Sequence, residues 1–294
     1  MRGVGRGEGS STGLHALPQP FILRRVLANL SGASYLLLGA ALITLVVRGR
    51  SDSTLALLVS SLLMFAFCLA SAAHLLGAGA ALRFAALAVG LGWFAEQMGA
   101  ARGWFFGDYH YTDMLGPRLG EVPVVIPMMW FALTYAAYVI ANLIVSRTPV
   151  DRSVRVADIA LLSFLSAMIV TAFDLGADPY FVYKLGAWIM VKKDGWWFGE
   201  TLEGFAGWMV VSFAILMTFR LWLRGRAPRP TPGFMRRHAA LPLLLYGGLM
   251  TYQMVLGYPV ETRTIAAFAM GIPLVCAVAG WREWVWATPA EDDA

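Results

Sequence analysis

The sequence has little charge, few cysteines and few histidines, and each shortage excludes a class of protein or site. Of its 294 residues, 14% are charged and 59% hydrophobic, whereas a soluble domain has about 25% charged and about 45–50% apolar residues. The composition indicates a membrane protein with many spans, not a soluble domain with an anchor. The two cysteines lie inside apolar runs, which argues against a disulfide framework. The four histidines are scattered without the spacing of metal ligands, so we expect no metal site.

The two ends of the chain lack the long apolar runs of its middle. Residues 1–20 are rich in Gly, Ser, Arg and Pro and predict a disordered tail. They contain no apolar stretch of the signal-peptide type, so we expect no cleavable leader. Residues 285–294 predict an acidic tail, and residues 21–284 a single transmembrane domain. The net charge of +5 comes mostly from arginines in short loops, which indicates contact with anionic membrane lipid and no binding of nucleic acid.

The middle of the chain is a series of apolar runs, and a membrane span needs about 20 such residues. Eight runs qualify; the third is short, and the last two are interrupted by proline or glycine. The runs are Arg25–Val47, Leu55–Leu76, Leu82–Met98, Val122–Val145, Val156–Leu175, Phe205–Leu223, Ala239–Leu256 and Thr264–Trp281. The sequence therefore predicts an all-α polytopic membrane helix bundle with seven or eight transmembrane helices.

Arginine and lysine predict the orientation of this bundle. With eight spans and the N-terminus in the cytoplasm, most of the 23 basic residues fall in cytoplasmic segments, with the densest group in residues 220–237. Cytoplasmic loops are enriched in Lys and Arg, so we expect both termini on the cytoplasmic side. The loops after the third and fifth spans then lie together on the opposite side.

Two stretches set carboxylates among aromatic residues beside apolar runs. Residues 96–130 contain the sequence GWFFG at 103–107, and residues 174–208 contain GWWFG at 195–199. Ionisable groups near hydrocarbon are costly, so they usually have a function or a partner. The aromatic-rich segment Pro179–Val191 is too short to span the membrane, and it predicts a short interfacial or re-entrant helix.

Three carboxylates are candidates for acid–base chemistry. Glu96 ends the third span, where its alternative role is an ion pair with a neighbouring arginine. Asp174 and Asp178 are four residues apart and share a face if the helix continues, although Pro179 predicts that the helix ends at Asp178. Such a pair is either a wetted helix end or a site at which one carboxyl keeps its proton. We expect all three carboxylates to converge.

The aromatic residues of the two stretches either line a substrate site or form an ordinary belt at the membrane surface. The candidates are Tyr109, Tyr111, Trp104, Trp130, Trp188, Trp196, Trp197 and Trp208. Glu200 and Glu203 flank Thr201 at the start of a span, which is typical of helix capping and dipole compensation. We therefore assign these two acids to the helix end and not to the site.

Both stretches also contain motifs with defined spacing. The first block is Glu96-x-x-Gly99, Phe106-Gly107-x-Tyr109-x-Tyr111, Leu115-Gly116, Val122-Pro123, Ile126-Pro127 and Trp130. The second block is Asp174, Asp178-Pro179, Trp188, Gly195, Phe198-Gly199, Leu202, Phe205, Gly207 and Trp208. Together they resemble the carotenoid biosynthesis protein family, which comprises membrane hydratases of the bisanhydrobacterioruberin and γ-carotene hydratase kind. The sequence departs from the family pattern at Met190, Thr201 and Gly204, which replace tryptophan, proline and asparagine.

The resemblance implies a hydro-lyase that adds water across a terminal C=C bond of an acyclic carotenoid to give a tertiary alcohol. A carboxylic acid protonates the alkene, and water traps the resulting tertiary carbocation. The resemblance makes Asp174 or Asp178 the proton donor, Glu96 the acid partner or water-orienting group, and the aromatic candidates substrate-lining residues that stabilise the cation. It implies no cofactor. The expected partners are the carotenoid, water, membrane lipid and other carotenoid biosynthesis enzymes, in a prokaryotic plasma membrane.

Two other functions fit the same residues. A small membrane transporter, or a protein that binds lipid or isoprenoid, would use the acids as proton relays or solute ligands. Such a transporter is expected to have water-accessible paths from both faces. A carotenoid cyclase would share the carbocation with a hydratase. A hydratase is expected to have a long apolar groove that opens to lipid and ends at the carboxylates.

Overall fold

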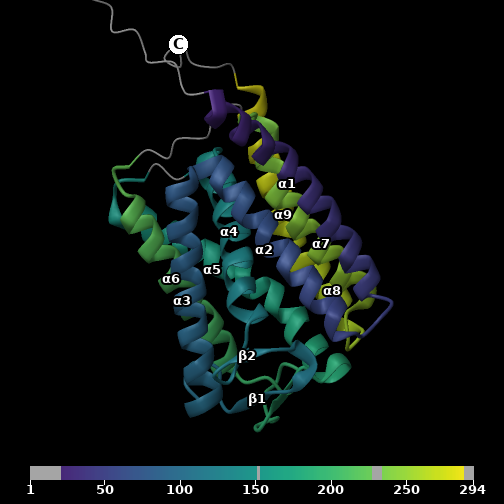
Figure 1. Cartoon of the computed structure of the whole chain (residues 1–294). Helices are drawn as coiled ribbons and strands as arrows, with labels where there is room; N and C mark the ends of the chain where they lie inside the picture. The colour runs from purple at the N-terminus through teal and green to yellow at the C-terminus, as the bar shows by residue number, and fades with distance from the viewer. Residues whose placement is uncertain (1–20, 151–152, 227–233, 288–294) are drawn as a thin grey trace, which may run out of the picture.

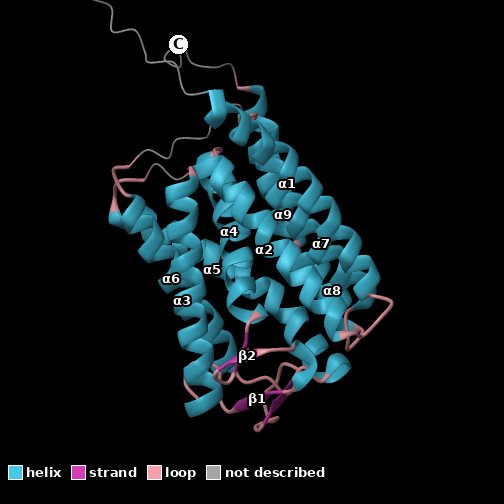
Figure 2. Cartoon of the chain, in the orientation of Figure 1, coloured by secondary structure: helices cyan, strands magenta, loops and turns pink. Residues whose placement is uncertain are grey.

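The computed structural model describes residues 21–150, 153–226 and 234–287 (Figure 1). The expected N-terminal tail at residues 1–20 lies outside these ranges, as do residues 288–294 of the expected C-terminal tail at 285–294, whereas residues 285 and 286 belong to the last helix. The described chain is a bundle of α-helices with a small patch of β-structure at one end, coloured by type in Figure 2. The all-α prediction is confirmed, and eight helical segments in the described ranges are long and apolar enough to cross a membrane.

Within the described residues, nine α-helices build the eight spans. They are α1 (Phe21–Arg48), α2 (Thr54–Leu76), α3 (Ala78–Arg102), α4 (Val125–Ser146), α5 (Val156–Pro179), α6 (Leu202–Leu223), α7 (Leu241–Leu256), α8 (Glu261–Ala269) and α9 (Gly271–Trp286). The last span contains both α8 and α9, and a 3-10 turn, η3 (Arg236–Ala240), leads into α7. The third span is longer than predicted: it continues from Met98 to Arg102 and stops where Gly103 adopts a left-handed conformation.

Helix α4 lies at the centre of the bundle and contacts α2, α3, α5 and α9. It has apolar or small residues on all sides, as expected for a helix buried all round. Its inner face packs aromatic rings against neighbouring helices; Phe84 of α3 contacts Phe131 and Tyr138 of α4 and stacks on Phe219 of α6 at 4.1 Å between ring centroids. This core joins α3, α4 and α6 into a rigid frame beneath the patch of β-structure.

Short strands join the two motif stretches. Strand β1 (Tyr109–Tyr111) pairs antiparallel with β4 (Trp188–Met190), so that Tyr111 lies opposite Trp188. A second pair, β2 (Arg118–Leu119) with β3 (Val122–Pro123), closes the loop before α4. Both pairs lie at the end of the bundle opposite to the start of α1 and the end of α9 (Figure 1). The two motif loops therefore share one side, as the sequence predicts.

The segment after α5 differs from the prediction. Helix α5 does not end at Asp178 but includes Pro179 and continues as a π-helical segment, η2 (Tyr180–Leu185). The expected interfacial helix over Pro179–Val191 is thus replaced by this continuation and by strand β4. Proline has no N–H, so the carbonyl of Leu175 loses its helical donor. The indole Nε1 of Trp197 donates to that carbonyl at 3.0 Å, which compensates the helix for the proline.

Candidate active site

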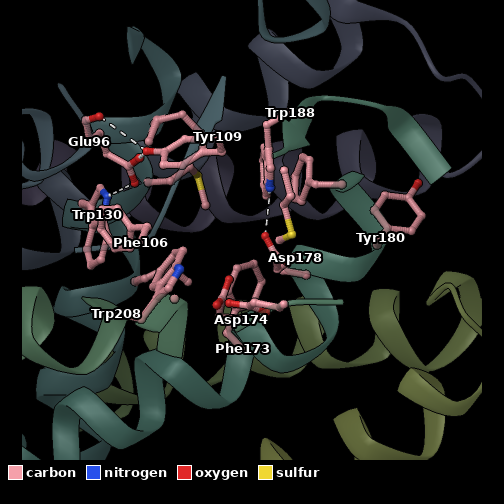
Figure 3. Close-up of a pocket in the computed structure, with 18 of the residues that line it drawn as sticks. Glu96, Phe106, Tyr109, Trp130, Phe173, Asp174, Asp178, Tyr180, Trp188 and Trp208 are labelled. Carbon is pink, nitrogen blue, oxygen red and sulfur yellow. Dashed lines mark hydrogen bonds between the residues drawn. The ribbon is translucent and has the colours of Figure 1, made fainter. Parts of the chain in front are cut away.

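A cavity of about 140 Å³ lies at the end of the bundle that carries the strands. Glu96, Asp174 and Asp178 all line it, although α3 and α5 are far apart in sequence. Figure 3 shows Glu96, Trp130 and Phe106 on one side and Asp178 with Trp188 on the other. The expected convergence of the three carboxylates on one cavity is therefore confirmed.

Glu96 is buried, with 5% of its surface exposed, and accepts three hydrogen bonds from side chains. Its Oε2 accepts from the Tyr109 hydroxyl at 2.5 Å and the Tyr111 hydroxyl at 2.6 Å, and its Oε1 accepts from Trp130 Nε1 at 2.9 Å. An ionised carboxylate is an acceptor only, and donors to it favour that form. The three donors therefore favour the ionised form of Glu96, whereas its burial opposes that form.

Two glycines on α3 make room for these donors. Gly92 and Gly99 lie four residues before and three residues after Glu96, so all three share a helix face. A Cβ atom on Gly92 would lie 2.7 Å from Trp130 Cγ, and one on Gly99 would lie 3.0 Å from the Tyr109 hydroxyl. Without side chains at these positions, the indole and the phenol close directly onto the carboxylate.

The two tyrosines keep their protons. Burial, followed by the charge of Glu96, raises the pKa of Tyr109 and that of Tyr111 well above the ordinary value of 10. Both therefore remain hydrogen-bond donors at any physiological pH. The alternative ion pair of Glu96 with arginine does not occur among the described residues, because Arg118 instead pairs with Asp113 at 2.9 Å.

The two aspartates lie one helical turn apart on α5 and both are buried, with 1% of Asp174 and 6% of Asp178 exposed. Asp178 Oδ1 accepts a hydrogen bond from Trp188 Nε1 at 2.9 Å, drawn in Figure 3. Asp174 Oδ2 is buried without a hydrogen-bond partner within the described ranges. Buried polar atoms are nearly always bonded, so this oxygen marks a place where a proton or a ligand belongs.

Glu200 is a third acid on the same side, and its interpretation as a capping residue is wrong. Thr201 is the N-cap of α6, and the Glu200 side chain is 5% exposed and lies close enough to Asp174 and Asp178 to interact with their charges. Burial, followed by the charges of the two aspartates, raises the pKa of Glu200 far above its ordinary value. Glu200 therefore keeps its proton.

Gly204 explains how Glu200 fits into the wall of the cavity. A Cβ atom at Gly204 would lie 2.6 Å from Glu200 Oε1. Glycine at this position leaves the space that the carboxyl occupies. Gly204 lines the cavity together with Met190 and Thr201, so all three departures from the family pattern face the same space.

The aromatic candidates separate into two groups. Those that line the cavity are Tyr109, Tyr111, Trp130, Trp188 and Trp208. Trp130 and Trp208 stack at 4.4 Å between ring centroids and form an aromatic wall beside Glu96. The remaining three, Trp104, Trp196 and Trp197, are not among the lining residues. Trp104 and Trp196 are 51% and 82% exposed, and Trp197 serves the Leu175 carbonyl.

The opposite wall comes from helices that the motifs do not include. Arg48 of α1 places its guanidinium over the rings of Phe181 and Tyr252, at 4.9 and 5.3 Å from the ring centroids. Gln253 of α7 donates to the Phe173 carbonyl at 2.8 Å and thereby supports the turn that carries Asp174. The sequence signal for both was a polar residue in or at the end of an apolar run.

This arrangement can perform acid–base chemistry on an apolar ligand. Glu96 is a carboxyl surrounded by donors that favour its ionised form, whereas Asp174, Asp178 and Glu200 are crowded acids that cannot all ionise in one buried site. Two carboxyl environments of this kind, on facing sides of an aromatic cavity, allow one side to give a proton and the other to take one. Among the described residues no group of three His, Cys, Asp or Glu side chains is placed to hold a metal ion.

Comparison with known proteins identifies the family. The model for carotenoid biosynthesis proteins matches residues 53–278, which include every acid and aromatic residue of the two motif stretches that lines the cavity. The chain belongs to the carotenoid biosynthesis protein family. It is 31% identical over 160 residues to a bisanhydrobacterioruberin hydratase of Haloarcula japonica, a match that covers 52% of this chain and 50% of that protein. The chain thus aligns with about half the length of that carotenoid biosynthesis protein. No solved structure matches it.

Proposed function

We propose that the protein is a membrane hydratase that adds water across a terminal C=C bond of an acyclic carotenoid and so forms a tertiary alcohol. The observation that carries this proposal is the pairing of a carboxyl that accepts three hydrogen bonds with crowded, buried carboxyls across one aromatic cavity. Family membership and the hydratase name of the Haloarcula relative support the same reaction class.

Asp174 is the proton donor in this mechanism. Its Oδ2 is the cavity-lining carboxyl oxygen of α5 that has no partner among the described residues, whereas Asp178 accepts a hydrogen bond from Trp188. A carboxylic acid in a dry site can protonate an alkene carbon directly. The C–H bond forms as the O–H bond of Asp174 breaks, and a tertiary carbocation remains on the neighbouring carbon.

The aromatic wall and Glu96 complete the reaction. The faces of Trp208 and Trp130 lie in the cavity lining, and each aromatic face stabilises a desolvated cation by about 1–2 kcal/mol. Glu96 orients the attacking water and takes its proton as the C–O bond forms. General acid and general base steps each contribute about 10²–10⁴-fold to the rate, so the two sides together account for a large acceleration.

The cavity accommodates only the end of such a substrate. Its volume of about 140 Å³ is below the about 300–1,000 Å³ of pockets that enclose a whole drug-sized ligand. The polyene chain therefore extends from the cavity between helices into lipid. This small volume supports modification of a terminal double bond rather than one in the middle of the chain.

The test is to incubate membranes containing the protein with lycopene-type substrates in ¹⁸O-labelled water. We expect products heavier by one labelled water, with the oxygen in a tertiary alcohol. Oxygen derived from O₂, or no mass gain with several acyclic carotenoids, would contradict the hydratase. A ring-closed product of unchanged mass would assign the shared carbocation to a cyclase instead.

A further inference from the structure

The cavity changes character along its length. Its deep part is lined by Leu45, Met64, Leu133 and Leu249 from the membrane-spanning helices. At the strand end the same cavity is lined by Asp108, Lys192 and Glu203, whose side chains are exposed. We call these three residues, together with the half-buried Thr201 that also lines the cavity, the polar mouth. The buried carboxyls lie between an apolar interior and this mouth.

The polar mouth is assembled from three separate segments. Asp108 follows the first GW-F-G pentad, Lys192 follows β4, and Glu203 lies in the first turn of α6. The Val191 N–H donates to the Asp108 carbonyl at 2.9 Å, which holds the first two segments together. Gly107 has a positive φ of 79°, and a Cβ atom there would lie 3.7 Å from Glu203 Oε2, so the third segment also touches the first.

Glu200 lies between the polar mouth and the aspartates. It precedes the mouth-lining Thr201 directly, its carboxyl faces Asp174 and Asp178, and its Oε2 is buried with no partner among the described residues. Other titratable groups around it are Tyr183, whose hydroxyl donates to the Phe198 carbonyl, and Glu203. A carboxyl that touches both a wet opening and a buried acid is placed to move protons between them.

The proposed hydration needs such a route. In each turnover Asp174 loses a proton to carbon and Glu96 gains one from water, so the overall reaction consumes water and no net proton. After the reaction Asp174 is deprotonated and Glu96 is protonated, which is the reverse of what the next turnover requires. One proton must leave Glu96 and one must reach Asp174 before the acid can act again.

We propose that water and protons enter through the polar mouth, and that Glu200 passes on the proton that restores the acid after each turnover. The proposal rests on the hydratase function, and it makes Glu200 a proton-transfer residue and not the donor to the alkene. The substrate then enters from lipid, and water enters from the strand end, by separate paths.

The first test compares single and repeated turnover of Glu200→Gln. Glutamine keeps the size and polarity of the glutamate side chain but cannot transfer a proton. With enzyme in excess over carotenoid we expect product formation close to that of the wild type; with carotenoid in excess, we expect the steady rate to fall at least tenfold. Glu121→Gln, at an exposed carboxyl outside the cavity, is the matched control and retains both. Equal steady rates for Glu200→Gln and the wild type overturn the proposal, as does loss of the first turnover.

The second test does not depend on activity, so it separates this proposal from the hydratase function. Thr201→Cys places a thiol in the mouth, and Ser61→Cys places one in the buried lining of the same cavity, both in a Cys276→Ser background that leaves only the buried Cys68. We expect a charged, membrane-impermeant thiol reagent to label position 201 at least tenfold faster than position 61. Equal labelling rates, or no labelling at 201, contradict the mouth even if the wild type hydrates carotenoids.

Discussion

The two sides of the cavity surround their carboxyls with opposite environments. On the α3 side a single carboxylate, Glu96, receives three hydrogen bonds from two tyrosines and a tryptophan. On the α5 side three acids crowd together, and Trp188 donates to Asp178. Donors stabilise charge, whereas crowding and burial oppose it. In the proposed mechanism the same chemical group therefore acts as a base on one side and as an acid on the other.

The supporting structure differs between the sides as well. The Glu96 side depends on backbone approach: glycines on α3 admit the rings of Trp130 and Tyr109 to the carboxylate. The α5 side depends on side chains that donate hydrogen bonds to the backbone of α5. Trp197 donates to the Leu175 carbonyl, and Gln253 donates to the Phe173 carbonyl. Glu96 is thus positioned because two glycines leave room for its donors, whereas the aspartates are positioned by side chains that donate to the helix backbone.

The largest expected effect comes from removing the acid. Asp174→Asn keeps size and hydrogen bonding but cannot protonate an alkene, so we expect turnover to fall by about 10³-fold or more, within the range for a general acid. Product formation per mole of purified protein measures this, with melting temperature and membrane insertion as checks on folding. Full activity in both Asp174→Asn and Asp178→Asn would remove the acid from the α5 side.

Removing the charge on the other side is expected to have the next largest effect. In Glu96→Gln the amide oxygen can accept from both tyrosines, but the NH₂ group then faces the N–H of Trp130. We expect turnover to fall about 10²-fold and the unfolding free energy to fall by about 1–3 kcal/mol from the mismatched donors. Activity and thermal melting measured on the same sample test both effects. A fully active Glu96→Gln would show that the charge is not used.

The spans and the carboxyls at their ends could be predicted from the sequence, because both are marked by residues that are close together in the chain. A run of about 20 apolar residues is sufficient to predict a span, and a carboxylate at the end of such a run stands out by its cost. The strand pairing of β1 with β4 could not be predicted, because three-residue strands have no pattern of their own and their register depends on where α3 and α5 end.

Glu200 was missed for a related reason. A glutamate just before a helix is usually a cap, and nothing in its neighbours along the chain reveals that α5 approaches it. The tryptophans show the same limit. Trp188 and Trp196 lie in equally aromatic stretches, yet one donates to Asp178 and the other is 82% exposed. Whether a tryptophan side chain points into the cavity or toward the surface depends on tertiary packing and not on the composition of its stretch.

The pH dependence of stability is the third test, through Glu200. A carboxyl whose pKa is raised on folding stabilises the folded state fully below its unfolded value of 4.5, and this contribution is lost as pH rises above 4.5. In Glu200→Gln the side chain at position 200 does not ionise, so this loss of stability with rising pH does not occur. We expect the variant to be the more stable protein above pH 5, with a difference that grows by about 1.4 kcal/mol per pH unit. Melting in detergent from pH 5 to 8 measures it, and parallel curves for the two proteins would show that Glu200 is ionised.

The smallest expected effect concerns the support of the α5 side. Trp197→Phe keeps the ring but removes the indole N–H, so the Leu175 carbonyl beside Pro179 loses its donor at 3.0 Å. An unsatisfied buried carbonyl costs about 1–3 kcal/mol, and because it lies one residue from Asp174, we expect turnover to fall a few-fold with little change in KM. Trp196→Phe is the matched control. Trp196 is the neighbouring residue and is 82% exposed, so stability and turnover of this variant should remain at the wild-type level. If the two variants behave alike, Trp197 does not position the aspartates, and the α5 side would owe its geometry to Gln253 and the π-helical segment alone.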